Sequence, residues 1–114
     1  MGKINPGYTI VYSRRAIHDL DEISDYISEI LQNPPAALNT VRKIQHTINK
    51  LADFPRIGTL LSDVDDIMDS DYRFLVCANY LAFYRVAKER VYIDRIMYGR
   101  RDYVTILFPN LRHD

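Results

Sequence analysis

Apolar residues recur at helical spacing through the first half of the chain. Downstream of Ser13 they lie three or four positions apart, with acidic residues between them, and this pattern predicts an amphipathic helix. Ser13 is a suitable N-cap for that helix. The predicted apolar face is Ile17, Leu20, Ile23, Ile27, Ile30 and Leu31, and the predicted polar face carries Asp19, Asp21, Glu22, Asp25 and Glu29.

A second helix is predicted directly after Asn33-Pro34-Pro35. Asn33 can cap it, and Pro34 suits the first helical position because its missing N–H would have no partner there. Its apolar stripe is Ala37, Val41, Ile44, Ile48 and Leu51, and Phe54-Pro55 ends it. The short link between the two helices predicts an antiparallel helical hairpin.

Strand patterns occur at both ends of the chain. Residues 8–12 form a β-branched and aromatic run, and residues 72–77, 80–87 and 91–98 form three more. Ala78-Asn79 and Lys88-Glu89-Arg90 are short enough to be tight turns, so the last three strands are expected to form an antiparallel meander. Residues 56–71 resemble an irregular acidic loop or a poorly formed strand. Asp102 can cap a short final helix that ends near Leu107.

The predicted order is β-α-α-β-β-β-α, an α+β fold of two layers with the hairpin packed on one face of the sheet. At 114 residues we expect one domain, residues 1–114, with 109–114 as a flexible tail. The first strand is expected at an edge of the sheet, but the pattern leaves its exact place open.

Composition narrows the functional classes. The single cysteine, Cys77, excludes an internal disulfide and fits a reducing, cytoplasmic setting. No apolar run is long enough for a membrane span, and the N-terminus lacks the apolar core of a signal peptide. No Cys/His cluster has metal-ligand spacing and no glycine-rich phosphate loop occurs, so neither a metal nor a cofactor is expected.

Charge is unevenly distributed although the formal net charge is +0. From residue 73 onward there are eight basic and four acidic residues, whereas residues 1–72 hold seven and eleven. Arg73, Arg85 and Arg95 each lie in a predicted strand, and Arg100 and Arg101 follow the last one. An arginine in a strand must reach water, a carboxylate or a ligand, because it keeps its charge. The cluster therefore suggests a surface for an anionic partner; for Arg73, an ion pair with Asp69 or Asp71 is the alternative.

Several short segments, in this order, resemble toxins of the RelE/ParE superfamily of bacterial type II toxin–antitoxin modules. The resemblance covers residues 8 to about 108 and therefore nearly the whole chain. Its segments are Tyr8-Thr-Ile-Val-Tyr-Ser13, Asp19-Leu-Asp-Glu-Ile23, Phe54-Pro-Arg-Ile-Gly58, Tyr72-Arg73, Asn79-Tyr80, Phe83-Tyr-Arg-Val86 and Ile96-Met-Tyr-Gly-Arg-Arg-Asp102.

This resemblance implies two rival activities and one shared partner. A RelE-like member is a ribosome-dependent endoribonuclease that cuts mRNA, whereas a ParE-like member poisons DNA gyrase by binding and is not an enzyme. Both are neutralised by a cognate antitoxin, with which they form hetero-oligomers.

For the nuclease, the resemblance makes Arg73 and Arg101 the phosphate-contacting residues and Tyr98 the available substitute for a proton-transfer group. None of the three histidines occupies the histidine position of the family. Supporting RNA, phosphate or target contacts would come from Arg95, Arg100, Tyr103 and Arg85. For the gyrase inhibitor, the same residues would form a protein interface.

Overall fold

The computed structural model describes residues 7–64 and 71–99, and the predicted final helix and tail lie outside these ranges. The helical hairpin is present: α1 spans Arg14–Asp25 and continues as a π-helical turn, η1, over Tyr26–Ile30. α2 spans Pro34–Asn49 and ends in a 3-10 turn, η2, over Lys50–Ala52. Both predicted N-caps are confirmed: the Ser13 hydroxyl accepts from the Ala16 N–H at 2.9 Å, and the Asn33 side chain accepts from the Ala36 N–H at 3.2 Å.

The described residues form a five-stranded sheet in the order β1-β5-β4-β3-β2. The predicted meander is confirmed as β3 (Arg73–Cys77), β4 (Tyr80–Ala87) and β5 (Arg90–Tyr98), all antiparallel. β1 (Thr9–Tyr12) pairs in parallel with β5 at one edge, and β2 (Thr59–Leu60) pairs with β3 at the other. A register shift between Phe83 and Tyr84 marks a bulge where β4 meets β5.

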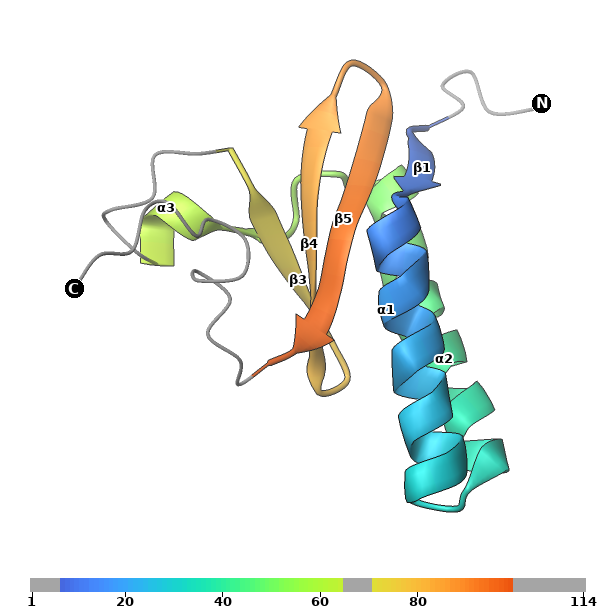
Figure 1. Ribbon diagram of the computed structural model, residues 1–114. Helices are drawn as coiled ribbons and strands as arrows, with labels where there is room; N and C mark the ends of the chain where they lie inside the picture. Colours follow the sequence, from blue (N-terminus) through green and yellow to red (C-terminus); the bar gives the residue numbers. More distant parts are fainter. Residues whose placement is uncertain (1–6, 65–70, 100–114) are drawn as a thin grey trace.

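The main core lies between the hairpin and the sheet. Figure 1 shows α1 and α2 on one side of the sheet and α3 (Leu61–Val64) on the other. From the helices the core takes Ala16, Leu20, Ile44, Ile48 and Leu51, and from the sheet it takes Cys77, Ala82, Tyr84, Val91, Ile93 and Ile96. A smaller cluster of Leu61, Phe83 and Met97 covers part of the opposite face.

The structure corrects the predicted faces of the first helix. Ile17, Ile30 and Leu31 were expected in the core but are 50%, 67% and 56% exposed. The π-helical turn contains an additional residue per turn, which shifts the register of the apolar stripe: Ile27 stays buried, whereas Ile30 and Leu31, at and after the end of the turn, are exposed. Asp19, expected on the polar face, is only 4% exposed.

The segment predicted as an irregular acidic loop or a poorly formed strand contains two short elements, β2 and α3, within its described part. A strand of two residues is too short to produce an alternating pattern, so periodicity could not predict it. In the part of the chain that the structure describes, no helix has the length and apolar character to cross a membrane.

Candidate functional site

Arg95, predicted to contact a target, forms an internal ion pair with α1. Its Nε and Nη2 donate to the two carboxylate oxygens of Asp19 at 2.9 and 3.1 Å. The same carboxylate accepts the N–H of Ile96 at 2.8 Å. β1 pairs with β5 only as far as Ile93, so Asp19 satisfies a backbone donor just beyond the end of β1. Arg95 therefore joins the hairpin to the sheet.

Arg85, on β4, forms a second internal ion pair with a residue of β5. Its Nε donates to the Asp94 carboxylate at 2.9 Å, and the Tyr72 hydroxyl donates to the same oxygen at 2.5 Å. The guanidinium also lies 5.4 Å from the ring centroid of Tyr92 and 6.0 Å from that of Tyr72. Burial, followed by the hydrogen bond to Asp94, raises the pKa of Tyr72 to about 12. Arg85 thus has a carboxylate and two rings as partners.

Arg73 contacts the chain between α2 and β2. Its Nη1 donates to the carbonyl oxygens of Arg56 and Gly58 at 3.1 and 2.9 Å. The Gly58 N–H in turn donates to the Tyr84 hydroxyl at 2.9 Å. Of the acids considered as its alternative partners, Asp69 lies outside the described residues, and the hydrogen bonds seen for Arg73 go to backbone oxygens. Arg73 therefore fixes a turn of the chain.

The surroundings of Gly58 leave no room for a side chain at this turn. A Cβ there would lie 2.5 Å from the Tyr84 hydroxyl oxygen and 2.7 Å from the Phe74 carbonyl oxygen. In the segment that leads to this buried glycine, Phe54 and Ile57 are 61% and 51% exposed. The Arg73 and Tyr84 contacts thus hold a backbone segment that presents two apolar side chains to solvent.

Tyr98 lies at the end of β5 and is 49% exposed. Its ring packs edge-on against Tyr80, with centroids 5.8 Å apart. The next residue, Gly99, donates its N–H to the Asn79 carbonyl at 3.0 Å. Arg100, Arg101 and Tyr103 lie outside the described residues. The structure therefore leaves Tyr98 accessible to a partner, away from the ion pairs of Arg85 and Arg95.

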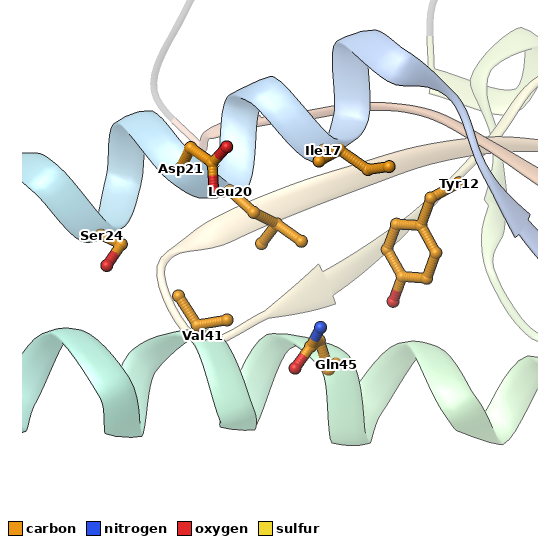
Figure 2. A pocket seen from close by; sticks show the side chains of 7 residues that line it. All are labelled: Tyr12, Ile17, Leu20, Asp21, Ser24, Val41 and Gln45. Atoms are coloured by element: carbon orange, nitrogen blue, oxygen red, sulfur yellow. The ribbon is translucent and has the colours of Figure 1, made fainter.

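A groove between α1 and α2, with a volume of about 400 Å³, was not predicted from the sequence. Figure 2 shows the side chains of Tyr12, Leu20, Val41 and Gln45 directed into the space between the two helices. Ile17, Asp21 and Ser24 complete the lining. Burial raises the pKa of Tyr12 to about 12, so its hydroxyl stays protonated and can donate to a ligand. In the sequence, Ile17 appears only as part of the apolar stripe predicted to face the core. In the structure it is half exposed and lines the groove instead.

The chemistry available in this part of the molecule is limited. Burial raises the pKa of Tyr80 and of Tyr84, and it raises the pKa of the buried Cys77 thiol to about 11. No group of three or more metal-binding side chains occurs among the residues that the structure describes. The described surface therefore presents binding features: an apolar groove, a constrained turn and an exposed tyrosine.

Comparison with solved structures supports the fold. A chain of the structure described as the chromosomal ParDE TA system from P. aeruginosa superposes with a TM-score of 0.66 at 24% identity. The match covers 80% of this chain and 95% of the other. No curated protein matches this chain. Residues 10–103 match the family described as the ParE toxin of the type II toxin–antitoxin system parDE, which is most of the sequence. The chain belongs to this ParE toxin family.

Proposed function

We propose that the protein is a growth-inhibiting toxin that inhibits DNA gyrase by binding, without catalysing a reaction, and that a cognate antitoxin neutralises it. Family membership supports this choice, because the ParE-like branch is the one whose members are expected to act on gyrase. The observation that carries the proposal is the internal use of the strand arginines. Arg85 and Arg95 form ion pairs with Asp94 and Asp19, and Arg73 donates to two carbonyls.

This arrangement disfavours phosphoryl chemistry on the sheet. Metal-independent RNA cleavage requires uncompensated positive charge at the scissile phosphate and a group that accepts a proton near neutral pH. Carboxylate partners compensate the charge of Arg85 and Arg95. The pKa values of Tyr12 and Tyr72 are raised to about 12, and a phenol that holds its proton so tightly is a poor general base.

The antitoxin partner is proposed to occupy the groove between α1 and α2. The groove combines apolar walls from Leu20 and Val41 with polar groups at Asp21, Ser24 and Gln45. Such a lining suits an amphipathic segment whose apolar side chains enter the groove while its backbone or polar side chains bind the rim.

The ribosome-dependent endoribonuclease remains the second candidate, because Arg73 and Tyr98 keep some capacity for external contacts. The described hydrogen bonds of Arg73 use only Nη1, and Tyr98, two positions before Arg100 in the chain, is about half exposed. In this alternative Arg73 and Arg101 bind the scissile phosphate, and Tyr98 transfers a proton.

The deciding experiment induces the toxin without antitoxin and follows labelled thymidine and labelled methionine over the first minutes. We expect thymidine incorporation to fall first, and purified toxin to inhibit supercoiling by gyrase in vitro. An earlier fall in methionine incorporation would contradict the gyrase proposal and favour the nuclease. Unchanged growth would instead indicate a non-toxic member retained for binding its antitoxin.

A further inference from the structure

α2 contains no acidic residue, although it is 16 residues long. Its cations are Arg42 and Lys43, with Lys50 at the C-cap, and the histidine His46 lies about one turn beyond Lys43. The acids of the hairpin lie mainly on the preceding helical segment, at Asp19, Asp21, Glu22, Asp25 and Glu29. The hairpin is therefore polarised, with a basic second helix beside an acidic first one.

The basic residues occupy one side of α2. Ile44 and Ile48 are fully buried against the sheet. With about 3.6 residues per turn, Lys43, His46 and Lys50 lie on the opposite side of the helix. A shallow surface hollow of about 490 Å³ runs along this face and ends at the β3–β4 turn; its lining is Asn39, Arg42, Lys43, His46, Thr47 and Ala78. We call the side chains of Arg42, Lys43, His46 and Lys50 the α2 basic stripe.

The α2 basic stripe has no internal partner in the described ranges, unlike the strand arginines. The ion pairs seen there join Asp19 to Arg95 and Arg15, and Asp94 to Arg85; Glu22 also lies 3.8 Å from the His18 ring. None includes a residue of the stripe. Arg42, Lys43 and Lys50 therefore face solvent with their positive charge uncompensated by the described residues, which favours a polyanionic partner.

We propose that the α2 basic stripe binds the phosphate backbone of duplex DNA. From Asn39 to Lys50 the face is about 16 Å long, at about 1.5 Å per residue. Over that length a duplex presents roughly nine phosphate charges, at one per about 1.7 Å. Each long side chain therefore has phosphates within reach. The proposal rests on the proposed function, since gyrase acts on DNA: the stripe would hold the toxin on the gyrase–DNA complex.

The lining favours DNA over an acidic peptide. Peptide segments that dock on a helix usually insert apolar anchors into it. Around the stripe, the residues are Asn39, Thr47 and the cations, and Ala78 is the one apolar contributor to the hollow. An apolar groove suited to a peptide lies elsewhere, between α1 and α2 at Ile17, Leu20 and Val41. The groove between α1 and α2 is therefore apolar and suits a peptide, whereas the α2 basic stripe is polar and suits DNA.

The test measures fluorescence anisotropy of a labelled duplex of about two helical turns, titrated with full-length toxin and no gyrase. Three phosphate contacts predict that affinity falls roughly 40-fold between about 50 and 200 mM salt. Arg42→Gln with Lys43→Gln should weaken binding about tenfold or more at low salt and reduce the salt slope by about two. The matched control, Lys88→Gln with Arg90→Gln, removes the same charge from the exposed β4–β5 turn and the first residue of β5, and it should change affinity less than about twofold.

Several outcomes would overturn the proposal. They are no duplex binding at low salt, equal losses in both double variants, or a loss only with Arg100→Gln and Arg101→Gln. Binding of polyglutamate that depends on Arg42 and Lys43, without binding of DNA, would assign the stripe to an acidic protein. If the circular dichroism spectrum shows that Arg42→Gln with Lys43→Gln does not fold, Lys43→Gln with Lys50→Gln removes the same charge and replaces it under the same criteria. Because gyrase is absent, DNA binding can fail while gyrase inhibition stands, and it can hold while that inhibition fails.

Discussion

Asp19 and Arg95 join α1 to β5 through two parallel hydrogen bonds, although 76 positions separate them in the chain. Asp19 is 4% exposed and the Arg95 side chain is 17% exposed. The same carboxylate also accepts a hydrogen bond from the N–H of Ile96. It therefore serves as acceptor for the Arg95 guanidinium and for a backbone donor at the edge of β5. This contact fixes how the hairpin lies on the sheet.

Replacement of Asp19 by Ala should therefore destabilise the fold strongly. Removing one member of a buried ion pair costs about 3–5 kcal/mol, because the remaining charge loses its partner without regaining full hydration. Urea unfolding should show this loss as a lower midpoint. Asp21→Ala is the matched control, since Asp21 is exposed on the same helix, and it should change the free energy of unfolding by less than about 0.5 kcal/mol. Equal effects of the two variants would contradict the role of Asp19.

This pair shows where reasoning from the sequence succeeds and where it stops. The caps at Ser13 and Asn33, the hairpin and the meander depend on neighbours within a few residues, and the sequence predicts them. The partner of Arg95 is an acid distant in the sequence, which the helical pattern assigns to the polar face. Periodicity identifies faces of one element, but it does not identify which buried charge meets which.

The candidate site was harder to predict for the same reason. The sequence predicts that Arg73, Arg85 and Arg95 each reach water, a carboxylate or a ligand, and it offers a specific acid, Asp69 or Asp71, only for Arg73. The described partners are Asp94 on the same sheet, Asp19 on α1 and two backbone carbonyls. The groove between the helices depends on the distance between them, which no local pattern encodes.

Gly58→Ala should destabilise the turn between α2 and β2. The added methyl group would overlap the Tyr84 hydroxyl and the Phe74 carbonyl, and overpacking of this kind costs about 1–3 kcal/mol. Adding Tyr84→Phe removes the closest of these contacts, that with the hydroxyl, although the ring carbon Cε1 at 2.8 Å remains, so the double variant should lose less stability than the sum of the single variants. Gly99→Ala is the control, because its nearest neighbour, the Asn79 carbonyl, lies at 3.3 Å. A thermal melt of the four variants would measure the effect.

Arg73→Met separates a structural role from a direct one. Loss of the hydrogen bonds to Arg56 and Gly58 should lower the free energy of unfolding by about 2 kcal/mol, because both are charge-assisted and the one to Gly58 is part-buried. Arg90→Met, at the exposed first residue of β5, should have almost no effect on unfolding. If Arg73→Met abolishes toxicity while the urea midpoint is unchanged, Arg73 acts on the target and not on the turn.

Stability should fall at alkaline pH. The pKa values of Tyr12 and Tyr72 are raised from 10.0 to about 12, and that of Cys77 from 9.0 to about 11. Between these limits the unfolded chain releases protons that the native state retains, so the free energy of unfolding decreases as pH rises. The stabilisation is complete below about pH 9 and is lost progressively up to about pH 12. Urea midpoints across this window test the prediction, and Tyr12→Phe with Tyr72→Phe should make the decline shallower. A decline unchanged in that variant would contradict the assignment.

Ile17→Glu should separate antitoxin binding from toxicity. Ile17 lines the groove between α1 and α2 and is 50% exposed, so a charge there should leave the core intact and obstruct an apolar partner segment. We expect the variant to remain toxic and to need at least about tenfold more antitoxin for neutralisation.

Leu38→Glu is the matched control: Leu38 is 52% exposed near the start of α2 and lies outside the groove lining. Titration of growth rescue with antitoxin, supported by calorimetry of the purified pair, would measure the difference. If both variants are neutralised as well as the wild type, the antitoxin uses another surface, and the exposed side chains of Phe54 and Ile57 are then the next ones to change.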